Sequence, residues 1–181
     1  MLINWIASKS FLEEMYKLSM DMNNCKIIIR LKNIGGYKNP YFNSIIKKIR
    51  NKKNIEINSN TETEYSYKIC SKADLVIAKH TSIADECISR DIPVIFHDYT
   101  HNMDGIIKGA FDYDNLSILC KNYSDMLNKT KQFLSSNNNA LKNQFQEIKN
   151  KYYFYDKKIT VKNKIINHLN NYLILQNKKK K

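Results

Sequence analysis

The sequence predicts a Rossmann-like, doubly wound α/β fold: a mostly parallel sheet of about six strands, helices on both faces, and further helices at the C-terminus. Short apolar runs bounded by turn residues alternate with amphipathic stretches of about 10–15 residues, which is the pattern of βαβ units. The run at residues 26–31 (KIIIRL) is nearly continuously β-branched. Such runs are typical of strands that are buried on both faces.

Each expected element has a local signal of its own. The expected strands are short apolar runs at residues 2–6, 26–31, 55–57, 74–78, 93–96 and, more weakly, 116–119. The expected helices carry apolar residues at helical spacing and lie at about residues 10–22, 40–49, 65–73, 81–90, 123–134, 140–152 and 161–175. Ser10 and Glu13 form a capping-box pattern for the first helix, and Pro40 opens the second. Asn122 or Ser124 is expected to cap the helix at 123–134.

Length and composition indicate one globular domain. The chain has 181 residues, 43% of them hydrophobic, so a single domain over 1–177 with a disordered basic tail at 178–181 is expected. The formal net charge of +13 favours acidic partners, but a generally Lys-rich, solvated surface explains it equally well.

Neither a signal peptide nor a membrane-spanning run is visible, which predicts a cytoplasmic protein. Peripheral contact with an anionic membrane is one further use of the charge.

The four cysteines do not suggest a metal site or a disulfide framework. They are Cys25, Cys70, Cys87 and Cys120, and no two have C-x-x-C spacing. Three of them lie in apolar contexts and are expected to be buried thiols.

The segment at residues 71–95 carries the clearest sign of chemistry. A buried strand there runs into a short polar turn, and a helix begins at once at Thr81 or Ser82. Ligands of open α/β sheets bind at the carboxyl ends of the strands, where a helix N-terminus favours a diphosphate. His80 could add a charge or a hydrogen bond, and Glu86 shares a helix face with Ser82, where it could bind ribose hydroxyls. Ordinary helix capping also explains a Ser or Thr at this position.

The order of features from Asp74 to Ile95 resembles the C-terminal, donor-binding half of GT-B-type glycosyltransferases. It is also similar to non-hydrolysing UDP-N-acetylglucosamine epimerases and to CDP-glycerol glycerophosphotransferases. The resemblance implies that Thr81 and Ser82 contact phosphate and that Glu86, or else Asp85, holds the ribose. It also implies a separate N-terminal acceptor domain, for which this chain has no room. A partner chain or a missing domain is therefore expected.

Several other residues near the expected strand ends are candidates for binding. Arg30 and Lys32 could face the same crevice as Ser82, although a solvated charge explains them equally well. Asp98 lies in the segment that follows the strand at 93–96, which is expected to line the sugar pocket. His97 and His101 have metal-like spacing around Asp98 but no third ligand, so no metal is expected.

The sequence therefore predicts the donor-binding half of a glycosyltransferase or glycerophosphotransferase of surface polysaccharide synthesis, and no catalytic residue is assigned. Its ligand would be a nucleotide-diphosphate sugar or a CDP-glycerol-like donor, without a cofactor. Two alternatives stay open: an epimerase-like domain, and a non-enzymatic binder of nucleic acid or membrane. The aromatic cluster at 152–155 is compatible with binding of nucleic acid, but no recognised nucleic-acid-binding motif accompanies it.

Overall fold

The computed structural model describes residues 2–31, 35–60, 62–79, 81–97, 117–135, 139–152, 163, 165–166 and 168–170. Its helices are α1 (Leu2–Asp21), α2 (Asn43–Arg50), α3 (Thr63–Cys70), α4 (Ser82–Ser89), α5 (Tyr123–Leu134) and α6 (Asn139–Tyr152), with short 3-10 turns η1 (Gly35–Lys38) and η2 (Pro40–Phe42). Its strands are β1 (Ile27–Arg30), β2 (Ile55–Asn58), β3 (Val76–Ala78) and β4 (Val94–Phe96). The predicted α/β class is therefore confirmed.

The strands form two parallel pairs. Ile27 of β1 lies opposite Ile55 of β2, and Val76 of β3 lies opposite Val94 of β4. A single parallel bridge joins Phe96 to Leu119, flanked by a hydrogen bond of 2.9 Å from the Cys120 amide to the Phe96 carbonyl. This bridge lies in the segment 116–119, where the sequence predicts a weak strand. Residue 116 of that segment lies outside the described residues. The described chain thus contains two two-stranded sheets, and it does not show the predicted single sheet of about six strands.

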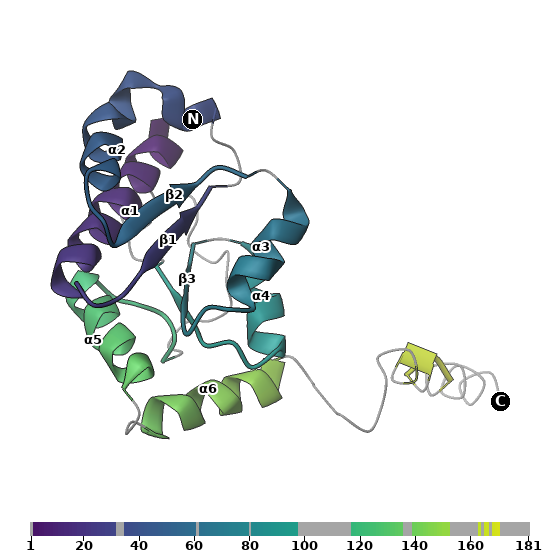
Figure 1. The fold of residues 1–181 in the computed structure, drawn as a ribbon. Helices are drawn as coiled ribbons and strands as arrows, with labels where there is room; N and C mark the ends of the chain where they lie inside the picture. Colours follow the sequence, from purple (N-terminus) through teal and green to yellow (C-terminus); the bar gives the residue numbers. More distant parts are fainter. Residues whose placement is uncertain are drawn as a thin grey trace.

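Helices cover both sides of the strands. Figure 1 shows α1, α2 and α5 on one side and α3 and α4 on the other. Helix α1 contacts β1, α2 and α5, whereas α4 contacts β3, β4 and α3. This arrangement has the layers of a doubly wound fold.

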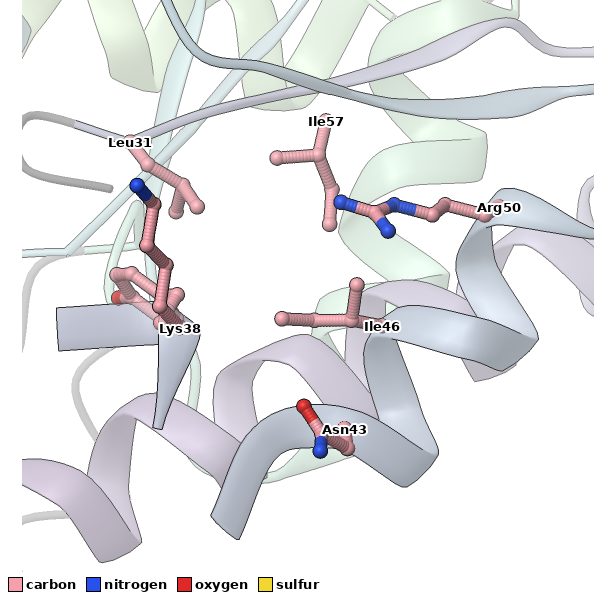
Figure 2. Close-up of a pocket in the computed structure, with 7 residues that line it drawn as sticks. Leu31, Lys38, Asn43, Ile46, Arg50 and Ile57 are labelled. Atoms are coloured by element: carbon pink, nitrogen blue, oxygen red, sulfur yellow. The ribbon is translucent and has the colours of Figure 1, made fainter. Parts of the chain in front are cut away.

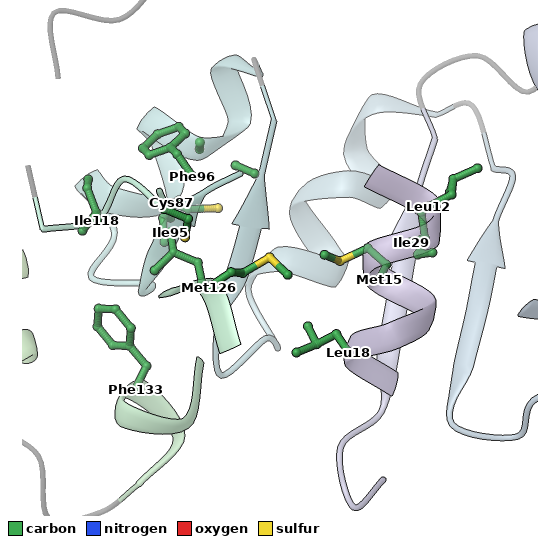
Figure 3. Close-up of a cluster of buried hydrophobic side chains, with 14 of the residues drawn as sticks. Leu12, Met15, Leu18, Ile29, Cys87, Ile95, Phe96, Ile118, Met126 and Phe133 are labelled. Atoms are coloured by element: carbon green, nitrogen blue, oxygen red, sulfur yellow. The ribbon is translucent and has the colours of Figure 1, made fainter. Parts of the chain in front are cut away.

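One hydrophobic cluster joins the two strand pairs. Leu12 and Met15 of α1 meet Ile29 of β1, and the same cluster continues through Ile95 of β4 to Met126 of α5 (Figure 3). All five side chains are almost completely buried. Because α1 packs against both halves, it connects the β1–β2 pair to the β3–β4 pair.

The prediction of a strand at residues 2–6 is wrong, because this segment is the first part of α1. A five-residue apolar run is compatible with either a strand or a helix, and no Gly or Pro separates it from the helical pattern that follows. Ser10 and Glu13 consequently lie inside α1 and cannot form the expected capping box. The helix extends N-terminally because a continuous helix keeps its backbone hydrogen bonds, while a lone strand would need a partner.

Most other boundaries lie within one to three residues of the predicted ones, but α3 begins two residues and ends three residues earlier than the predicted 65–73, and Pro40 opens a 3-10 turn instead of α2. Helix α5 occupies the predicted 123–134, and the Asn122 side chain accepts a hydrogen bond of 2.9 Å from the Asp125 amide, which confirms Asn122 as the cap. Helix α2 begins after Pro40, whose 3-10 turn is capped by Asn39. Ile45 and Ile49 form the buried stripe of α2, and Phe42 of the preceding 3-10 turn is buried as well. Among the described helices, none has both the length and the apolar character needed to cross a bilayer.

Candidate functional site at the carboxyl ends of the strands

Helix α4 begins where the sequence predicts, directly after Thr81. Thr81 is the N-cap of α4, with an extended backbone (φ −143°, ψ 131°), and its side chain makes no capping hydrogen bond. Ser82 is the first helical residue and is exposed, while Thr81 is half-buried. The first amides of α4 and the positive end of its dipole therefore lie next to two hydroxyl groups, an arrangement suited to an anion.

Glu86 points toward helix α3. Its Oε1 atom accepts a hydrogen bond of 2.7 Å from the Tyr67 hydroxyl, and the Arg90 guanidinium lies 5.8 Å from the centre of the Tyr67 ring. The hydrogen bond to Glu86 raises the pKa of Tyr67, and desolvation raises it further. Tyr67 therefore orients the carboxylate that the resemblance assigns to a ribose. Whether Glu86 contacts a ligand stays a prediction.

A pair of thiols lies beside Glu86 at the same contact between α3 and α4. Cys87 is buried in α4, and the half-buried Cys70 lies at the end of α3. Interaction with the neighbouring Cys87 thiol lowers the pKa of Cys70 to about 7, against the opposing effect of burial. The pKa of Cys87 is raised by its interaction with Cys70 and by burial. The expectation of buried thiols is thus met at Cys87 and Cys120, whereas Cys25 and Cys70 are half-buried.

Arg30 connects the end of β1 to the start of α3. Its Nε donates to the Ser66 hydroxyl (3.0 Å), its Nη1 to the Leu31 carbonyl (2.7 Å) and its Nη2 to the Glu62 carbonyl (3.2 Å). Three hydrogen bonds fix the guanidinium at the carboxyl end of a strand, where a cation would help to hold a phosphate. Arg30 is therefore both a structural link and a candidate ligand contact.

Three further predicted site residues cannot be placed. Lys32, His80 and Asp98 lie outside the described residues, as does the basic tail at 178–181. Among the residues that are described, no group of three His, Cys, Asp or Glu side chains is arranged to hold a metal ion.

The structure brings together one polar pair that the sequence did not predict. His97 directly follows β4 and its side chain is completely buried. Its Nε2 lies 2.6 Å from Oε2 of Glu14 on α1, and its ring meets Phe11 edge to face at 5.0 Å. Its backbone amide also donates to the Ala78 carbonyl (2.8 Å) at the end of β3. The pair therefore holds α1 over the carboxyl ends of β3 and β4.

One sequence signal could have identified Glu14. It is three residues after Phe11 and four before Leu18, so it lies on the apolar stripe of α1. A carboxylate in such a stripe needs a polar partner within the core.

Comparisons of the chain with protein-family models, with curated proteins and with solved structures found no match. The functional argument therefore depends on the residues themselves.

Proposed function

We propose that this domain binds the nucleoside diphosphate part of an activated donor at the turn between β3 and α4. The observation that carries the proposal is the Thr81 cap: an extended residue at a strand-to-helix turn whose hydroxyl is not used to cap the helix. Ser and Thr at such positions usually accept a hydrogen bond from the helix backbone. Here that hydroxyl is available to a ligand at the N-terminus of α4, beside the exposed Ser82.

The surrounding residues support a nucleotide rather than a bare anion. Tyr67 fixes the Glu86 carboxylate one helical turn beyond Ser82, where a carboxylate could accept hydrogen bonds from ribose hydroxyls. Arg30 supplies a fixed cation at the end of β1. Diphosphate and ribose contacts on neighbouring strand ends are the usual arrangement of nucleotides on doubly wound sheets.

The reaction class proposed for the site is transfer from a nucleotide-linked donor to a polysaccharide acceptor, as in glycosyltransferases and glycerophosphotransferases. The α4 N-terminus and Arg30 would stabilise the leaving diphosphate without a metal ion. The acceptor and the general base would come from another domain or a partner chain.

Calorimetry with UDP, CDP and GDP tests the proposal. We expect one of them to bind, and Ser82→Ala combined with Glu86→Ala to weaken it at least tenfold. Ser44→Ala is the matched control, because Ser44 is an exposed serine in the first turn of α2. Absence of binding by all three nucleotides at millimolar concentration would contradict the proposal. So would equal binding by the double variant and the control.

A further inference from the structure

A cavity of about 270 Å³ lies between helix α2 and the β1–β2 pair, on a different part of the fold from the turn before α4. Its lining is largely apolar and comes from several elements. It consists of Leu31 directly after β1, Ile57 of β2 and Ile46 of α2, to which Tyr37 of η1 contributes. Figure 2 shows these aliphatic side chains surrounding an open centre. The cavity is thus largely apolar and lies between α2 and the β1–β2 pair.

Two cations reach toward this hollow. Lys38 extends from η1 on one side, and Arg50 extends from the last turn of α2 on the other, so that their head groups approach from opposite walls (Figure 2). Both side chains are exposed. Asn43, at the start of α2, adds an amide to the lining.

Some basic residues elsewhere in the described chain are in ion pairs, whereas others, such as Lys48, are not. Lys26 lies 3.2 Å from Glu56, and Lys129 lies 2.7 Å from Asp125. Within the described residues, neither Lys38 nor Arg50 has a carboxylate within ion-pair distance. The helix dipole alone accounts for a basic residue at the end of α2, but it does not account for Lys38 on the opposite wall.

We infer that this cavity binds a small organic anion, with its acidic group between Lys38 and Arg50 and its hydrocarbon body against Leu31, Ile46 and Ile57. Charge complementarity selects an anion over a neutral ligand of the same shape. The volume is just below the range of 300–1,000 Å³ typical of sites for drug-sized ligands. A medium-chain carboxylate or a single acidic ring therefore suits the cavity. This site is independent of the proposed nucleotide site.

Binding of octanoate, octanol and octylamine to the intact chain tests this inference, because the three probes differ only in the head group. Backbone amide shifts in NMR titrations report both the affinity and the location. We expect octanoate to bind at least tenfold more tightly than the alcohol and the amine not to bind. Shortening the carboxylate should weaken binding about fourfold per methylene removed. The largest shifts should fall on residues around the cavity.

Charge variants then separate the cavity from the general positive charge of the protein. Arg50→Gln and Lys38→Gln should each weaken octanoate binding at least fivefold, and Arg50→Lys should retain most of it. Lys48→Gln is the matched control, because Lys48 is an exposed cation of the same helix that does not line the cavity. We expect that control to change the affinity less than twofold. All these side chains are exposed, so thermal melting should show the variants folded.

Three results would overturn the inference: octanol binding as tightly as octanoate, Lys48→Gln weakening binding as much as Arg50→Gln, or shifts located away from the cavity. Arg50→Gln should leave nucleotide binding at α4 unchanged. Failure of one site is thus distinguishable from failure of the other.

Discussion

Replacing Glu14 by alanine should destabilise the fold far more than the same change at its neighbour Glu13. Glu14 is 21% exposed and lies 2.6 Å from the completely buried His97 ring. A hydrogen bond to a charged group contributes about 1.5–3 kcal/mol, and its loss would leave a buried polar ring nitrogen without this partner. We therefore expect Glu14→Ala to lower the free energy of unfolding by about 2 kcal/mol.

Glu13 provides the control because both changes replace a glutamate within the same helix. Glu13 faces Lys9 at 3.9 Å, and its side chain is 54% exposed. Exposed ion pairs at i,i+4 on a helix contribute about 0.3–0.5 kcal/mol, so loss of the pair in Glu13→Ala should lower the free energy of unfolding by no more than that. Both variants also gain slightly from the higher helix propensity of alanine. Glu14→Gln, which retains an acceptor oxygen, should fall between the two variants.

Urea unfolding followed by circular dichroism measures these differences as shifts of the midpoint at constant slope. A difference of less than about 0.5 kcal/mol between Glu14→Ala and Glu13→Ala would refute the reasoning. It would mean that α1 is held over the strand ends by apolar packing alone. A changed slope would instead indicate that the variant alters the unfolded or native ensemble.

Three other predictions concern Cys70, Asp91 and Asn122. Cys70 should react first with a thiol reagent, with a pH midpoint of about 7. Cys87→Ala should raise that midpoint, because it removes the thiol that favours the Cys70 thiolate. Asp91 has a positive φ of 64° and binds Lys149. Asp91→Ala should therefore lower the melting temperature, because it removes the ion pair and because alanine tolerates the left-handed conformation less well than aspartate, whereas Asp91→Gly should cost less. Asn122→Ala should cost about 1 kcal/mol in urea unfolding by removing the α5 cap, and an unchanged midpoint would contradict that role.

The fold was predictable wherever a local pattern had one interpretation. The run at 26–31 contains β1, and the helix at 123–134 was found with its correct boundaries and cap. The error at 2–6 arose because a short apolar run has no period of its own. Its conformation was decided by continuity with the helix that follows.

The site was predictable only in the parts that depend on neighbouring residues in the chain. Thr81 as a helix cap follows from a strand, a polar turn and a helix in succession. The bond from Tyr67 to Glu86 joins residues 19 positions apart, and that between Glu14 and His97 joins residues 83 positions apart. No local pattern specifies such pairs, because they depend on which faces α1, α3 and α4 turn toward the strands.

These two long-range pairs act on opposite sides of the β3–β4 pair. On one side, Glu14 and His97 attach α1 to the end of β4, and on the other side Tyr67 attaches α3 to α4 through Glu86. The Thr81 turn is the connection from β3 to α4, so its position depends on how the helices on both faces are fixed. A ligand site needs side chains held by such supporting contacts to discriminate between ligands. The polar pairs therefore favour a preformed arrangement of the proposed site at the Thr81 turn over one that a ligand would assemble.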